Sequence, residues 1–68
     1  MLAGEVYFYD KNEEVIEKMD LFDYEEMSEE KFVKFLKEID CFKATLHGYY
    51  NNHQQNPTIE VIYEKQKE

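Results

Sequence analysis

The sequence predicts a single small α+β domain over residues 1–68, with two β-hairpins that flank one helix in the order ββαββ. Three observations predict this fold. A chain of 68 residues has the length of one domain. Its apolar residues recur with a period of two near both ends and with a helical period between them. Six Tyr and five Phe, with one Pro and two Gly, argue against disorder. We therefore expect a four-stranded antiparallel sheet with the helix packed on one face.

Residues 2–20 are predicted to form the first hairpin, with its turn at residues 10–13. As a strand, the second half of this hairpin places an ionisable group on the inner face, whichever face that is: Glu17 on one face, or Lys18 and Asp20 on the other. Inward charges are typical of edge strands that must not pair further. A helix over residues 13–22 stays open as an alternative, with Asn12 as its cap. Four apolar residues fit that helical stripe: Val15, Ile16, Met19 and Phe22.

Residues 28–39 are predicted to form the helix, and residues 21–27 an acidic connector that leads into it. Ser28 is a typical N-cap, and Glu29 and Glu30 stand in the first turn, where the helix dipole favours acids. Apolar residues then follow the spacing of one helix face. These residues are Phe32, Phe35, Leu36 and Ile39.

Residues 41–64 are predicted to form the second hairpin, with strands at 41–50 and 58–64 and a polar loop at 51–57. Gly48 within the first strand indicates a bulge or a close backbone approach. Alternation divides the last strand into two faces, Ile59, Val61 and Tyr63 against Thr58, Glu60 and Ile62. Residues 65–68 are expected to be a frayed tail.

The formal charge of -8 is concentrated in residues 10–30, which we call the acidic segment. It holds ten acids and two lysines, a difference of eight, whereas the rest of the chain holds six acids and six lysines. This surplus argues against direct binding to nucleic acid and to anionic membranes, which need a basic surface. It favours a protein partner with a basic surface.

The acidic segment predicts a non-catalytic protein-binding surface that imitates the charge of a nucleic acid. Acids two apart in an extended strand lie about 6.6 Å apart on one face, and duplex phosphates advance about 3.4 Å per residue along each strand. The partner would then be a nucleic-acid-binding protein. The alternative is a solvated face that only confers solubility. The predicted contact residues are Asp20, Asp23, Tyr24, Glu25, Glu26, Glu29 and Glu30.

In size, charge and lack of catalytic residues, the chain resembles the small acidic inhibitors and DNA mimics of phages and mobile elements. That resemblance implies a viral or mobile-element inhibitor.

A second hypothesis is a structural or oligomerisation module that uses the sheet face without a helix. One helix leaves the other face of the sheet open, and tyrosine is common at protein interfaces. A homodimer could form there, although tyrosines on a sheet also pair across strands without any partner. The predicted residues of this face are Tyr7, Tyr9, Tyr49 and Ile62.

We expect no catalytic residues, no cofactor and no metal site, and hence no enzyme. Cys41, His47 and His53 are the only cysteine and histidines, and no two have a zinc-binding spacing. In one strand Cys41 and His47 would lie about 20 Å apart, too far for a nucleophile and its base. Cys41 is instead predicted to be a small apolar residue at the end of the helix.

The sequence also predicts a soluble, cytoplasmic protein. No apolar run approaches the roughly 20 residues that span a bilayer. No signal pattern stands at the N-terminus. A lone cysteine, Cys41, fits a reducing compartment.

Overall fold

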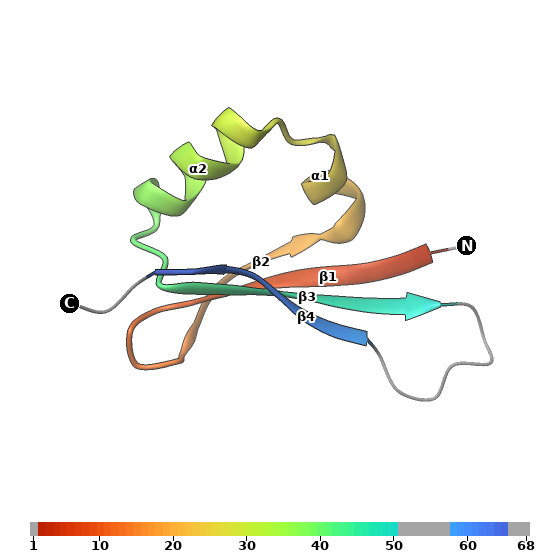
Figure 1. Ribbon diagram of the computed structural model, residues 1–68, viewed down its shortest axis with the longest axis horizontal. Helices are drawn as coiled ribbons and strands as arrows, with labels where there is room; N and C mark the ends of the chain where they lie inside the picture. Colours follow the sequence, from red (N-terminus) through yellow and green to blue (C-terminus); the bar gives the residue numbers. More distant parts are fainter. Residues whose placement is uncertain (1, 51–57, 66–68) are drawn as a thin grey trace.

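The computed structural model describes residues 2–50 and 58–65 and has the element order ββααββ. Four antiparallel strands form one sheet, and both helices lie on the same side of it (Figure 1). The predicted α+β fold is therefore confirmed, with one helix more than expected. The elements are β1 (Leu2–Tyr9), β2 (Val15–Asp20), α1 (Leu21–Glu26), α2 (Glu29–Glu38), β3 (Lys43–Tyr50) and β4 (Thr58–Glu64).

The strand order is β2-β1-β3-β4, so the two hairpins join through their first strands, β1 and β3. In this central pair Val6 lies opposite Leu46 and Phe8 opposite Ala44. Paired residues project to the same side of a sheet, and Val6, Phe8 and Ala44 belong to the core under the helices. We call this side the helix face and the other side the open face.

The first hairpin forms as predicted, and residues 15–20 are a strand rather than part of a helix. Asp10 organises its turn, because its Oδ1 accepts hydrogen bonds from the backbone N–H groups of Asn12 (2.8 Å) and Glu14 (3.0 Å). Glu13 adopts the left-handed conformation, with φ of 64°. One acid of the acidic segment, Asp10, thus has a structural role in the turn.

The predicted connector is wrong in part, because it contains the short helix α1. Leu21 and Tyr24, three residues apart, lie on one face of this single turn and a half. Leu21 is buried, and Tyr24 packs against the core with its ring 5.3 Å from that of Phe32 in an edge-on arrangement. Tertiary packing of this kind stabilises a helix that is too short to form alone.

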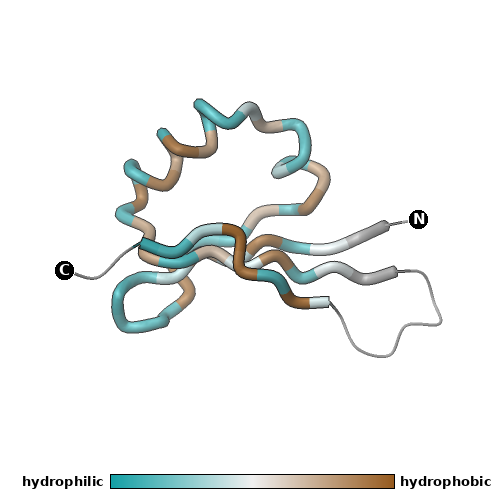
Figure 2. The backbone as a smooth tube through the Cα atoms, viewed as in Figure 1, coloured by the Kyte–Doolittle hydropathy of each residue, from teal (hydrophilic) through white to brown (hydrophobic). Residues whose placement is uncertain are grey.

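Helix α2 matches the predicted helix to within one residue at each end. The Ser28 hydroxyl accepts a hydrogen bond from the backbone N–H of Lys31 (3.2 Å), which is the expected N-cap. Figure 2 shows hydrophilic and hydrophobic positions alternating along α2, as an amphipathic helix requires. In the part of the chain that the structure describes, neither helix is long and apolar enough to cross a membrane.

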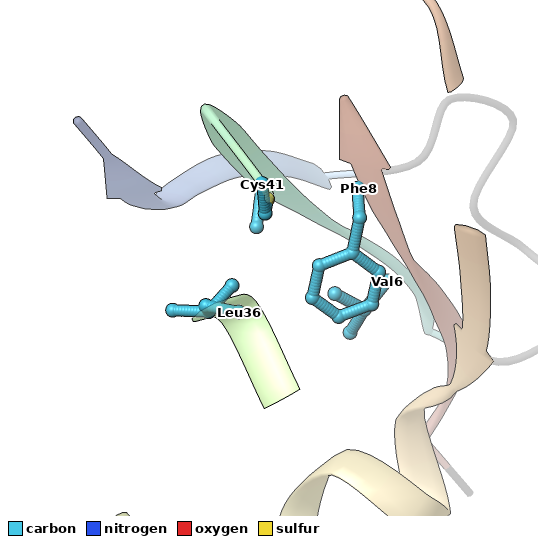
Figure 3. Close-up of a cluster of buried hydrophobic side chains, with 5 residues drawn as sticks. Val6, Phe8, Leu36 and Cys41 are labelled. Carbon is cyan, nitrogen blue, oxygen red and sulfur yellow. The ribbon is translucent and has the colours of Figure 1, made fainter. Parts of the chain in front are cut away.

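The core lies between α2 and the centre of the sheet. Leu36 projects from α2 toward Val6, Phe8 and Cys41 (Figure 3). The ring of Phe8 is fully buried and lies 5.1 Å from that of Phe35. Cys41 is 3% exposed, and its thiol donates a hydrogen bond to the carbonyl oxygen of Lys43 (3.1 Å). Its prediction as an apolar residue at the helix end is confirmed.

Strand β4 departs from the simple alternation that the sequence suggested. The register shifts between Ala44 and Thr45 of β3, where the partners change from Tyr63 to Val61 and leave Ile62 as an extra residue. Such a β-bulge places the residues on its two sides out of phase. Ile62 and Tyr63 therefore both pack on the helix face. The prediction that Ile62 lies on the open face is wrong.

Both edge strands carry features that disfavour pairing with another sheet. Each has a register shift. In β2 the shift lies between Glu17 and Val15, the partners of Phe8 and Tyr9, and in β4 it lies at Ile62. Each also turns an acid toward the helix face, since Glu17 lies opposite Phe8 and Glu60 opposite Leu46. Bulges and inward-pointing charges are common means of blocking edge-to-edge association. The charge predicted on the inner face of the second strand is thus Glu17.

The close backbone approach predicted at Gly48 involves the other glycine. Gly4 of β1 lies directly opposite Gly48 of β3. A Cβ atom at Gly4 would overlap the carbonyl oxygen of His47. A side chain at Gly4 would therefore force the two central strands apart.

Candidate functional site

Six exposed acids extend from the end of β2 over α1 to the first turn of α2. We call this group the acidic surface: Asp20, Asp23, Glu25, Glu26, Glu29 and Glu30. Among the described residues, no lysine or histidine forms an ion pair with any of the six. Their charges are therefore not neutralised within the fold, apart from the helix dipole of α2, which stabilises Glu29 and Glu30.

Helix α1 sets the direction of the acids in its own turn. Because Leu21 and Tyr24 face the core, Phe22, Asp23 and Glu26 are turned away from it. Asp23 and Glu26 are three residues apart and lie side by side on the outer surface, with Cβ atoms about 5–6 Å apart. The strand spacing of about 6.6 Å expected for this part of the acidic segment therefore does not apply.

Phe22 is the hydrophobic centre of the acidic surface. Its side chain is 70% exposed, the largest fraction of any large hydrophobic residue that the structure describes. On α1 it neighbours Glu25 and Glu26, which follow it by three and four residues. This ring is therefore available for an apolar contact with a partner protein, with charged groups around it.

The structure differs from the sequence-based prediction at Tyr24. This residue is half-buried against the core and contacts Phe32, so it is not an outward-facing anchor of the acidic surface. The exposed aromatic residue of α1 is Phe22 instead. A helical wheel for residues 21–26 would have separated the two, because Phe22 lies about 200° from Tyr24 at 100° per residue.

A groove runs between α2 and β4 on the helix face, beside the acidic surface. Its volume is about 580 Å³. Its apolar lining includes Phe32, Val33, Leu36, Ile62 and Tyr63. A smaller hollow of about 250 Å³ adjoins it at Tyr24 and Glu25. No local pattern predicts this groove, because it depends on how α2 lies over the sheet.

The open face carries a short polar chain instead of a free tyrosine surface. The Tyr9 hydroxyl and the Thr45 Oγ1 are 3.1 Å apart, and the same Thr45 oxygen is 2.9 Å from Nε2 of His47. The His47 ring in turn lies 4.5 Å from the Tyr7 ring, edge to face. Tyr7 and Tyr9 thus have partners within the sheet. The side chain of Tyr49 lies outside the described residues.

Aliphatic residues are the more exposed part of the open face. Val61 lies opposite Thr45 and Ile59 opposite His47, and these two side chains are 50% and 61% exposed. Val15 lies at the other edge, opposite Tyr9. The register shift that moved Ile62 to the helix face is what brings Ile59 and Val61 here.

Cys41 and His47 are the cysteine and the histidine among the described residues. Burial raises the pKa of the Cys41 thiol above its ordinary value of 9.0, so the thiol stays protonated and unreactive at neutral pH. Cys41 lies in the core, whereas His47 lies on the open face. Within residues 2–50 and 58–65, no three His, Cys, Asp or Glu side chains come close enough to hold a metal ion. His53 lies outside these ranges.

Comparison with models of known families, with curated protein sequences and with solved structures finds no significant match to this chain. The function of the candidate site is therefore inferred from the geometry of its own residues.

Proposed function

We propose that this protein binds the basic, nucleic-acid-binding surface of a partner protein and blocks it. The acidic surface supplies the charge, and Phe22 supplies an apolar contact at its centre. The observation that carries the proposal is the 70% exposure of Phe22 on a helix whose outer face is otherwise acidic. A face that served only solubility does not require such a ring.

The negative charge of the acidic surface determines which class of protein it attracts. Six unneutralised carboxylates attract a positively charged surface, steer its approach and reject acidic ones. Nucleic-acid-binding proteins carry such surfaces because they must neutralise closely spaced phosphates. Asp23 and Glu26 are neighbours on the outer surface of α1, with Cβ atoms about 5–6 Å apart, so both carboxylates can contact one basic surface that otherwise binds closely spaced phosphates.

A reducing cytosol is the compartment that fits this proposal, because nucleic-acid-binding proteins act there. The free thiol of Cys41 is also typical of a reducing compartment. In this role the protein would be an inhibitor of the type that phages and mobile elements encode, as its size and charge suggest.

A pull-down with two baits tests the proposal. The first bait is the unaltered protein, and the second carries Asp20→Asn, Asp23→Asn, Glu25→Gln and Glu26→Gln. These changes preserve shape, and Asp20 makes no capping hydrogen bond that would be lost. We expect the first bait to capture a basic nucleic-acid-binding protein at low salt, and the capture to fall at least tenfold with the second bait or at high salt.

A third bait with equal charge provides the matched control. It carries Glu13→Gln, Glu14→Gln, Glu17→Gln and Glu64→Gln, four exposed positions outside the acidic surface. We expect it to retain most of the capture, because local geometry and not net charge determines binding. Equal capture by all three baits would contradict the proposal and shift attention to the open face.

A further inference from the structure

We infer that the groove between α2 and β4 binds an amphipathic helical segment of the partner, with an apolar face flanked by lysine or arginine. This inference rests on the proposed function for the partner's basic character. It adds a second contact, whose lining includes Glu25 and Glu29 of the acidic surface but not Phe22. The groove volume of about 580 Å³ lies within the range of about 300–1,000 Å³ that binding pockets occupy.

The groove exposes apolar surface that the fold leaves uncovered. Helix α2 packs over the centre of the sheet through Leu36, and β4 extends beyond it at the edge. Ile62 and Tyr63 form the floor on β4, while Val33, 43% exposed, forms part of the α2 wall. Hydrophobic surface gathered in a hollow on so small a protein marks an interaction site.

A helix fits this groove better than an added strand. Strand addition would use the free edge of β4, where the bulge at Ile62 and the inward-facing Glu60 disfavour pairing. A helix laid into the groove needs only apolar side chains at three- and four-residue spacings. Its backbone hydrogen bonds are already satisfied, so it requires no backbone donor from β4.

Charge defines the residues that should flank the apolar face of the bound helix. Glu25 and Glu29 stand on the groove rim, and Glu60 lines the adjoining hollow, against one lysine, Lys37. Three carboxylates against one ammonium favour a basic segment. Because Lys37 is in the last turn of α2 and Glu25 is on α1, the acids gather at the α1 end. The basic residues of the segment should lie at that end.

Selection from a phage-displayed library of random 16-residue peptides tests the groove with the intact protein. We expect enriched peptides to carry apolar residues at helical spacing together with Lys or Arg. Their binding should weaken at least tenfold on Val33→Lys, which places a charge on the apolar wall, and on Glu60→Lys. The matched controls are Val61→Lys and Glu64→Lys. These exposed positions lie on the open face, and we expect less than a twofold change there.

Amide chemical shifts of the protein, recorded with an enriched peptide, locate the contact. We expect the changes to centre on Leu36, Ile62 and Tyr63. The groove proposal is overturned if no peptide is enriched, if the enriched peptides lack basic residues, or if they bind the Val33→Lys protein as tightly as the unaltered one.

The same variants separate this proposal from the proposed function. If the captured partner is lost with Phe22→Ala but kept with Val33→Lys, the acidic surface stands and the groove proposal fails. If it is lost with Val33→Lys but kept with Phe22→Ala, the groove stands and the role of Phe22 in the proposed function fails.

Discussion

Replacing Phe8 by alanine is expected to unfold a large part of the population. Phe8 is fully buried, and its ring contacts those of Phe32 and Phe35, so its loss leaves a cavity at the junction of α2 and the sheet. Phe→Ala in a core costs about 3–5 kcal/mol. A domain of 68 residues has a total free energy of unfolding of only about 3–10 kcal/mol. Urea denaturation followed by circular dichroism measures the change.

Phe22→Ala is the matched control for this stability prediction. It removes the same atoms from a side chain that is 70% exposed, so the free energy of unfolding should change by less than about 1 kcal/mol. If Phe8→Ala were as stable as Phe22→Ala, the assignment of the core between α2 and the sheet would be wrong.

The same Phe22→Ala substitution is expected to weaken partner binding by about 30-fold or more. If the partner buries this ring at the centre of the interface, its truncation costs about 2 kcal/mol or more, and about 1.4 kcal/mol corresponds to a factor of ten in affinity. Isothermal titration calorimetry with the purified partner, at a fixed salt concentration, measures the dissociation constant.

Ile59→Ala controls for the general loss of exposed hydrophobic surface. Ile59 is 61% exposed on the open face, away from α1, and its removal should change the dissociation constant less than twofold. Equal weakening by Ile59→Ala, or no weakening by Phe22→Ala, would show that the partner contacts a different part of the protein.

Much of the fold was predictable from local patterns. The alternation around Val6 and Phe8 predicted a strand, and Ser28 followed by acids and an apolar stripe predicted α2 and its cap. These signals are reliable because each depends on residues close in sequence. The first hairpin competed with a helix. The structure shows it as a strand because Met19 pairs with Val6 across the sheet, a contact outside the range of any local pattern.

The errors arose where tertiary contacts override the local pattern. Helix α1 was missed because its inner face consists of only two residues, Leu21 and Tyr24. A six-residue helix is too short for a helical period to be recognised in the sequence. Ile62 was assigned to the wrong face because a β-bulge shifts the alternation by one residue. No residue pattern within 58–64 indicates that bulge.

The candidate site was predictable in charge but not in shape. The sequence located the acids of the acidic surface, whose exposure follows from their charge. It did not distinguish Phe22, which faces outward, from Tyr24, which packs inward. The groove between α2 and β4 also had no signal in the sequence, because it combines side chains of α1 and α2 with Ile62 and Tyr63 of β4, which are distant in sequence.

Displacement of nucleic acid from the captured partner tests the central claim most directly. The partner is loaded with a fluorescently labelled oligonucleotide, and this protein is titrated in while the anisotropy is recorded. The account predicts that the oligonucleotide is released, and that the variant with Asp20, Asp23, Glu25 and Glu26 neutralised releases at least tenfold less at equal concentration. A ternary complex, in which the partner holds the oligonucleotide and this protein together, would contradict it.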